Sequence, residues 1–304
     1  VTGDDMQAVS STKRVANYYR FNFTKDDNPS SHWSYLYSII QNCNLILMNI
    51  DKLVIDEDDK AYRDDLKGEA LAIRGLALFD LPRIFGYPYL KDNGTSLGVP
   101  IIEGLSTIDS KPTRNTVAQC YTKIIDDLTQ SLSLLGEKFN KGKINKWGAM
   151  VLLSRVYLYK GENANALKMA SDAIIGAEKN KYALWTNEDY PTAWGEDASA
   201  SKPGEVLFEI VNLTTDSPGK ESMGYLNSYD GYDDMCITCS FYQFLKEDPK
   251  DIRLKLLSFD KKYYAYVNKY QPQREENIED ANIPLIRLSE AYLNAAEAAV
   301  KEND

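Results

Sequence analysis

The sequence contains a single histidine, His32, among its 304 residues. A metal site built on several histidines is therefore excluded, and a catalytic centre that pairs serine or cysteine with histidine is disfavoured. No apolar run approaches the ~20 residues that a membrane-spanning helix needs. A glycine-rich phosphate loop with its lysine and the Gly-x-Ser-x-Gly pattern of hydrolases are also missing. The common nucleotide-binding and hydrolytic signatures are thus absent.

Basic residues are in deficit as well. The chain has 35 Lys and Arg against 45 Asp and Glu, a net charge of −10. Neutralising phosphates needs a basic surface, so a nucleic-acid partner is not expected.

Cysteine is sparse, with Cys43, Cys120, Cys236 and Cys239 too few for a disulfide scaffold in a chain of this length. The last two form a Cys-x-x-Cys pair, but neither a second ligand pair nor a thioredoxin-type context accompanies it. A redox or metal-binding role is therefore disfavoured, and two ordinary thiols or a local disulfide are the favoured interpretation. The acidic run 56–59 lacks the glycine and the spaced glutamate of a calcium loop and is interpreted as a solvated connector. We expect no metal ion and no cofactor.

Apolar residues at helical spacing fill the first part of the chain. Stripes with steps of three and four predict helices over 33–50, 66–84, 117–135, 147–159 and 164–175. Thr116 is the expected N-cap of the third helix, and the fourth helix is apolar nearly all round. Pro82 is expected to kink or end the second helix.

The last two of these helices match the tetratricopeptide pattern. Ser154 and Tyr157 fit the first helix of such a repeat, Gly161 fits the turn, and Ala166 and Ala173 fit the second helix. Small side chains at these positions let two backbones approach closely. Any other antiparallel helix pair remains the alternative.

From residue 182 to about 260 the pattern changes. Glycine, proline and polar residues dominate, with one strand-like run at 206–211, and helical spacing returns only at 285–300. Long irregular segments in a compact domain usually carry function.

Seven blocks spread over the chain occur together and in order in one known family. They are Trp33–Asn44, Lys67–Gly75 with Phe85–Tyr89, Leu97–Ile101, Tyr121–Leu128, Leu153–Tyr159, Glu205–Ile210 and Ile283–Ala298. Each block is weak alone, but the ordered set resembles the SusD/RagB outer-membrane nutrient-binding lipoproteins of Bacteroidetes. Gly75 and Pro82 depart from the usual family residues.

The resemblance implies a mainly α fold: a tetratricopeptide-like helical repeat scaffold with a loop-rich irregular half. It implies one SusD-like domain over 1–304, with the scaffold at about 33–177 and 285–300 and the ligand-binding half at about 182–282. Family members continue beyond the final helix, so we expect a C-terminal truncation. An outer-membrane, cell-surface, lipid-anchored location is also implied, with the signal peptide and lipid-bearing cysteine outside this sequence.

The function implied by the resemblance is non-enzymatic capture of an oligosaccharide or polysaccharide. The ligand would pass to a SusC-like TonB-dependent outer-membrane barrel on which the repeat face docks. A peptide-binding RagB-like protein remains an alternative. A glycoside hydrolase is a weaker one, because 45 acidic residues always offer carboxylate pairs. A cytosolic repeat adaptor is the least specific option.

Five charged residues recur in the family pattern: Glu69, Arg74, Arg287, Glu290 and Glu297. A catalytic or ligand-clamping role is one interpretation. The favoured one is structural, with Glu69 near Arg74 and Arg287 near Glu290 making contacts within helices or at caps. No catalytic residue is assigned.

Candidate ligand-binding residues come from the aromatic side chains of the loops. Tyr225, Tyr229 and Tyr232 recur at short spacing, interleaved with Asn227, Asp230, Asp233 and Asp234. A sugar ring can lie with its C–H face on an aromatic ring while neighbouring polar groups bond its hydroxyls. Trp194 and Tyr89 are further candidates because each lies in a predicted loop. Ordinary packing of these aromatic side chains is the alternative.

Overall fold

The computed structural model describes residues 3–22, 30–107, 109–195, 203–213, 215–260, 264–272 and 277–303. The chain divides into two compact units. The helical unit comprises Pro29–Ala183, Lys202–Phe208 and Ile286–Asp304. The loop unit comprises Val1–Asn28, Leu184–Ser201 and Glu209–Leu285.

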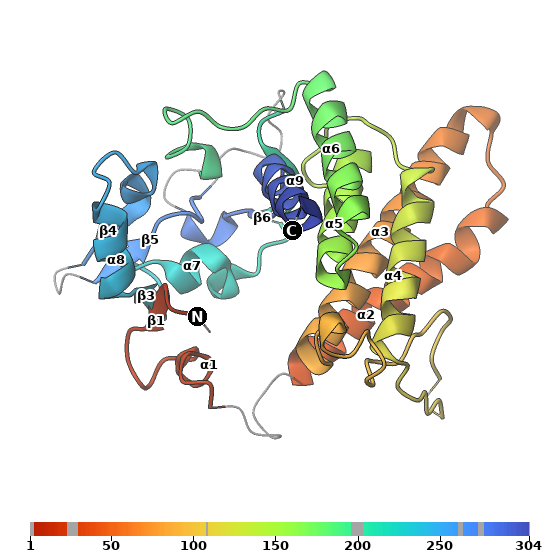
Figure 1. Ribbon diagram of the computed structural model, residues 1–304, viewed down its shortest axis with the longest axis horizontal. Helices are drawn as coiled ribbons and strands as arrows, with labels where there is room; N and C mark the ends of the chain where they lie inside the picture. Colours follow the sequence, from red (N-terminus) through yellow and green to blue (C-terminus); the bar gives the residue numbers. More distant parts are fainter. Residues whose placement is uncertain are drawn as a thin grey trace. The chain divides into compact units, whose positions relative to one another are not determined.

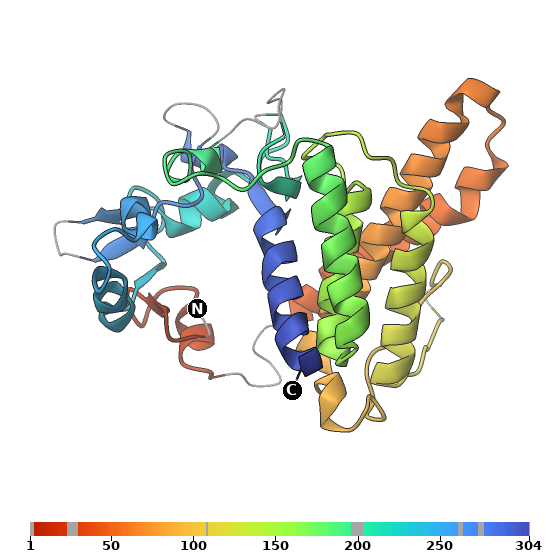
Figure 2. The ribbon, with the colours of Figure 1, turned by 45° about the horizontal axis from the view of Figure 1, so that its top comes forward.

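Six long helices build the helical unit (Figure 1). Contacts link α2 with α3, α3 with α4, α4 with α5, α5 with α6, and α6 with α9. Figure 2 shows α9 beside the pair formed by α5 and α6. The helices are α2 (Ser30–Asn49), α3 (Lys60–Phe85), α4 (Val117–Leu132), α5 (Lys146–Lys160), α6 (Asn163–Lys179) and α9 (Leu288–Asn303). The predicted mainly α fold is confirmed.

Helix α3 is buried on more sides than its predicted stripe implies. The predicted stripe consists of Leu66, Ala70, Ile73, Ala77, Leu81 and Ile84. Because α3 packs against both α2 and α4, Leu71, Leu78 and Phe79 are buried as well, whereas Ile84 at the end of the stripe is exposed. The helix passes through Pro82 and ends at Phe85, three residues later than the proline.

Local signals set the ends of the next helices. Thr116 and Gln119 form a reciprocal capping box at the start of α4. Gly161, with φ of 80°, ends α5 in the left-handed conformation that favours glycine. Both signals were predicted correctly.

The predicted repeat residues lie at helix contacts. Ala166 and Ala173 of α6 are fully buried, and Leu158, Ala166 and Ala298 form one core cluster. The Ser154 hydroxyl accepts a hydrogen bond of 2.8 Å from the Asn294 amide of α9. Small residues therefore let α5, α6 and α9 approach one another closely.

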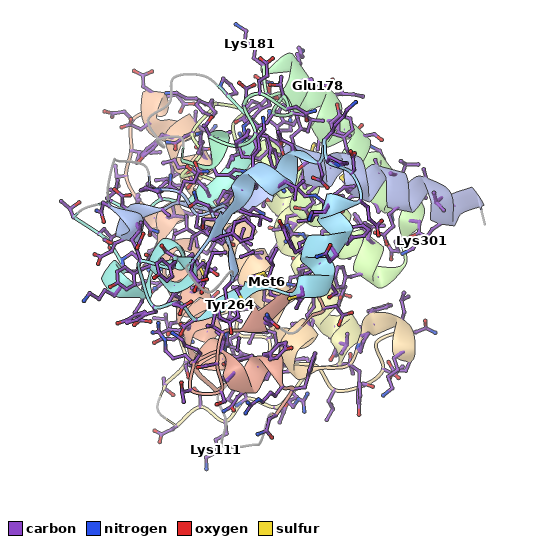
Figure 3. All side chains as sticks on the ribbon, turned by 90° about the vertical axis from the view of Figure 1, so that its left-hand side faces the viewer. Met6, Lys111, Glu178, Lys181, Tyr264 and Lys301 are labelled. Atoms are coloured by element: carbon purple, nitrogen blue, oxygen red, sulfur yellow. The ribbon has the colours of Figure 1, made fainter. Side chains whose placement is uncertain are left out.

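The predicted helix over 285–300 begins later than expected. Ile283–Arg287 is a strand, β6, paired with β2 (Val206–Ile210), and α9 starts at Leu288. Each unit holds one end of both strands. The Tyr292 hydroxyl of α9 donates to the carboxylate of Glu178, which is labelled in Figure 3.

The recurring charged residues have structural roles, but the expected pairings within the set were wrong. The Arg74 guanidinium bonds Asp127 at 2.6 and 2.8 Å and Asn44 at 2.8 Å, all buried. The other contacts are Glu69 with Lys143, Glu205 with Arg287, Arg155 with Glu290, and Glu297 with Lys301. Except for Glu297, the partners come from a distant part of the sequence, which the short spacings from Glu69 to Arg74 and from Arg287 to Glu290 do not reveal.

Short elements make up the loop unit. Strand β1 (Met6–Ala8) pairs antiparallel with β3 (Met235–Ile237), and β4 (Leu257–Phe259) pairs antiparallel with β5 (Ala265–Val267). Met6 and Tyr264, which precedes β5, are labelled in Figure 3. The helices are α1 (Ala16–Tyr19), α7 (Met223–Asn227) and α8 (Cys239–Lys246). The sequence pattern predicted the irregularity but not α7 or α8.

All four cysteines are free thiols. Cys236 is buried in β3, where burial raises the pKa of its thiol, whereas Cys239 is exposed at the start of α8. The Cys-x-x-Cys pair is thus two ordinary thiols here. No helix within the described residues is long and apolar enough to cross a membrane.

Candidate ligand-binding surface

The three candidate tyrosines lie in one compact segment, residues 225–234, which we name the tyrosine loop. The Ser222 hydroxyl caps α7 by accepting from the Tyr225 amide at 3.1 Å. The chain then folds back, so that the Tyr232 amide donates to the Tyr225 carbonyl at 2.9 Å and the Asp233 amide to the Ser228 carbonyl at 3.2 Å. The loop is therefore internally hydrogen-bonded.

Gly231 makes this fold-back possible. A Cβ at this position would lie 2.0 Å from the Tyr225 carbonyl oxygen, a distance that no side chain can occupy. The close backbone approach brings Tyr225 and Tyr232 together, with ring centres 5.0 Å apart in an edge-to-face arrangement.

Two of the three rings offer surface to a ligand. Tyr229 is 46% exposed and Tyr232 is 37% exposed, while Tyr225 is half-buried. We expect Tyr229 and Tyr232 to make contacts and Tyr225 to support them.

Residues near the N-terminus hold the loop. The Arg14 guanidinium carbon lies 4.0 Å from the Tyr232 ring centre, and the same side chain bonds Asp234 at 3.0 Å and Glu221 at 2.9 and 3.0 Å. Burial acts to lower the pKa of Arg14, but Asp234 and Glu221 raise it on balance. The Lys13 ammonium donates to the Tyr232 carbonyl at 2.6 Å. One face of Tyr232 is thus covered by a cation.

A buried tyrosine holds the loop from β5. Tyr266 is almost fully buried, its hydroxyl donates to the Asp233 carboxylate, and its ring centre lies 6.0 Å from that of Tyr229. Burial, followed by the contact with Asp233, raises the pKa of Tyr266 well above its ordinary value. The hydroxyl therefore stays protonated and remains a donor.

The polar residues expected to bond a ligand are mostly used within the protein. The Asp233 carboxylate forms an ion pair with Lys13 and accepts a hydrogen bond from the Tyr266 hydroxyl. Buried Asp234 forms an ion pair with Arg14, and the buried Asn227 amide donates to the Met223 carbonyl. Asp230 is exposed, and its carboxylate has no partner among the described residues. It is the one interleaved acid left for an outside hydroxyl in that part of the chain.

Trp194 belongs to a different aromatic cluster of the loop unit. It is only 3% exposed, packs edge-on against Trp185 and Tyr190, and has the Lys269 ammonium 4.2 Å from its ring centre. Its burial leaves little ring surface for stacking.

Tyr89 lies in the helical unit, at the start of a short 3₁₀ turn (Tyr89–Lys91). Its ring packs 5.1 Å from that of buried Tyr121 in α4. Tyr89 is therefore not part of the tyrosine loop.

The tyrosine loop borders a cavity too small for a sugar. This cavity, of about 30 Å³, is lined by residues that include Asn227, Ser228 and Tyr266. A ligand would have to bind on the outer surface of the loop. Over the described ranges, no group of three His, Cys, Asp or Glu side chains is placed to hold a metal ion.

Sequence reasoning missed Lys13, Arg14 and Tyr266. Arg14 lies 220 residues from Asp234 and 207 from Glu221, so no spacing pattern connects them. The basic pair at 13–14 carries no motif of its own. The pairing of β1 with β3 brings this segment to the loop.

Comparisons with known proteins agree with this fold. A SusD-like family described as "Starch-binding associating with outer membrane" matches residues 2–158. A crystal structure named "Putative sugar binding protein" from Bacteroides vulgatus is 81% identical, with a TM-score of 0.96 over all of this chain and 68% of that chain. A SusD superfamily protein from Bacteroides thetaiotaomicron is 36% identical, with a TM-score of 0.90 over 99% of this chain and 70% of its own.

Among curated proteins, a SusD-like protein from Bacteroides ovatus is 27% identical over 135 residues. The match spans 44% of this chain and only 23% of that relative's length. On the family match and these structural likenesses, the chain belongs to the SusD-like family.

Proposed function

We propose that this chain binds glycan at the cell surface and delivers it to a SusC-like TonB-dependent outer-membrane transporter. In this proposal the protein is lipid-anchored and not an enzyme. The helical unit is the scaffold, the loop unit carries the ligand, and both belong to one domain. Family membership and the name of the 81% identical Bacteroides vulgatus protein support this assignment.

One observation carries the proposal: two exposed tyrosine rings, Tyr229 and Tyr232, lie on a loop held by fixed contacts. Arg14, Lys13 and Tyr266 each bond the loop, so its rings need little ordering when a ligand arrives. An open platform of this kind gives weak binding, with Kd from micromolar to millimolar.

The experiment is affinity gel electrophoresis on a panel of polysaccharides, followed by calorimetry with oligosaccharides of the class that binds. Tyr229→Ala and Tyr232→Ala are each expected to weaken binding at least ten-fold, about 1.4 kcal/mol. Tyr35→Ala is the control, because Tyr35 is an exposed tyrosine on α2 of the helical unit, outside the tyrosine loop.

The same samples are assayed for new reducing ends and for binding of peptides. Saturable glycan binding without cleavage is the expected result. Cleavage would replace the proposal with a glycoside hydrolase, and binding of peptides alone would replace the ligand class. Equal binding by both tyrosine variants and the control would remove the tyrosine loop as the site.

A further inference from the structure

A second candidate site lies in the helical unit, in a cavity of about 250 Å³. It is formed by the first turns of α3 and the segment that joins α4 to α5. We name it the basic cavity. Its lining residues are Tyr62, Asp65, Gly136, Lys138, Phe139, Asn140, Lys143, Ile144 and Asn145.

The walls of the basic cavity are fixed. The Asp65 carboxylate accepts from the Gly136 amide at 2.8 Å, which ties the joining segment to α3. Phe139 packs edge-on against buried Tyr182 at 5.8 Å, and Asn145 caps α5 while its amide donates to the Tyr182 hydroxyl at 2.7 Å. The cavity is therefore preformed.

The segment that joins α4 to α5 is basic, whereas the chain as a whole is acidic. Residues 133–145 contain three lysines and one acidic residue, Glu137, and the whole chain has a net charge of −10. Two of these lysines, Lys138 and Lys143, line the cavity. Over the described residues, the Lys138 ammonium has no acidic partner, and that of Lys143 is 3.4 Å from Glu69. Asp65 also lines the cavity, and its carboxylate accepts from the Gly136 amide. The Lys138 ammonium is therefore the group left to bind a ligand with negative charge.

The lining also offers an aromatic face. Tyr62 is 59% exposed, and the Lys143 ammonium lies 5.4 Å from its ring centre. A cation at the edge of an exposed ring suits a ligand with a flat apolar face and an acidic group next to it. The volume is below the 300–1,000 Å³ typical of sites for larger ligands, so it matches a single ring.

We propose that the basic cavity binds one uronate ring, a sugar that carries a carboxylate. The ring lies on Tyr62, its carboxylate meets Lys138 and Lys143, and the Asn140 amide bonds a hydroxyl. This site goes beyond the proposed function, because it names an acidic sugar and uses none of the tyrosine loop. Two partly exposed ammonium groups and one ring give a Kd on the order of 1 mM.

The test is a titration followed by ¹H–¹⁵N NMR, with D-galacturonate and D-glucuronate as probes. D-galactose and D-glucose are the neutral counterparts, and acetate tests the carboxylate alone. We expect the uronates to shift the amide signals of residues 136–143 and to bind at least ten-fold more tightly than the neutral sugars or acetate.

Variants locate the site. Lys138→Gln and Tyr62→Ala should each weaken uronate binding at least five-fold. Lys168→Gln is the matched control, since Lys168 is an exposed lysine on α6. The double variant Tyr229→Ala/Tyr232→Ala should leave uronate binding unchanged, which separates this site from the proposed function.

Equal binding of neutral sugar or of acetate, or shifts confined to residues outside 136–143, would overturn the proposal. So would unchanged affinity in both Lys138→Gln and Tyr62→Ala. Lys138 is exposed and has no described acidic partner, so its variant should fold normally and a loss of binding can be assigned to the site.

Discussion

Each of the two units of this molecule is stabilised internally by a different kind of contact. In the helical unit, most helices pack on their neighbours in sequence, and the buried Arg74–Asp127 pair joins residues 53 apart. In the loop unit, Arg14 and Lys13 reach residues more than 200 positions away. The helix contacts leave a periodic trace in the sequence, whereas the Arg74–Asp127 pair and the contacts of Arg14 and Lys13 do not. The helices of the scaffold can therefore be predicted from sequence, whereas the supports of the tyrosine loop cannot.

The largest effect is expected in the core of the helical unit. Asp127→Ala leaves the buried Arg74 guanidinium without its carboxylate and should lower the free energy of unfolding by about 3–5 kcal/mol. Urea denaturation measures this. Asp126→Ala, at the exposed neighbouring residue, is the control and should cost less than about 1 kcal/mol. Equal losses for the two variants would show that the buried pair does not organise α3 and α4.

A smaller loss of stability with a clear loss of binding is expected in the loop unit. Arg14→Ala removes the cation from Tyr232 and leaves Asp234, which is 5% exposed, without its partner. We expect about 1–3 kcal/mol of lost stability and a several-fold weaker affinity for glycan.

Arg20→Ala is the control for Arg14, because Arg20 is an exposed arginine of the same N-terminal segment. Calorimetry with the best oligosaccharide and thermal unfolding measure the two effects. An Arg14 variant that binds glycan as tightly as the parent would contradict the role of Arg14 in positioning the loop.

Particular residues show which structural features can be predicted from the sequence. Thr116, Gly161 and Ala166 were predicted in their roles because caps, turns and small-residue contacts are local or periodic. The loop tyrosines were predicted to gather because they lie within eight residues of one another. Their supports, Arg14 and Tyr266, were missed because tertiary folding alone brings them near. The burial of Trp194 was missed because three aromatic residues close in sequence pack on one another instead of facing outward.

A moderate, local effect is expected at the start of α4. Thr116→Ala removes a side chain that accepts from the Gln119 amide at 3.2 Å and should cost about 1 kcal/mol. Thr122→Ala, within the same helix, should cost less because its hydroxyl only bonds the preceding turn. Urea denaturation midpoints of the two variants measure these losses of stability. A larger loss for Thr122→Ala than for Thr116→Ala would contradict the assigned cap.

The smallest effect concerns a surface contact of the helical unit. The hydrogen bond and charge of Lys123, 2.6 Å away, hold the pKa of Glu103 below its usual value. Because the folded pKa is lowered, the pair stabilises the fold above the ordinary pKa of glutamate, and this contribution is lost as the pH falls through the folded pKa.

Glu103 is mostly exposed, so Glu103→Gln should cost no more than about 0.5 kcal/mol at pH 7. Urea midpoints of parent and variant should differ more at pH 7 than at pH 3. A difference of the same size at both values would contradict the assignment.

The most direct test of the central claim is a crystal structure of this chain with the neutral oligosaccharide that binds most tightly in the panel. The account predicts a sugar ring against Tyr229 or Tyr232, with Arg14 still covering the opposite face of Tyr232. An oligosaccharide bound elsewhere, with the tyrosine loop unoccupied, would contradict it.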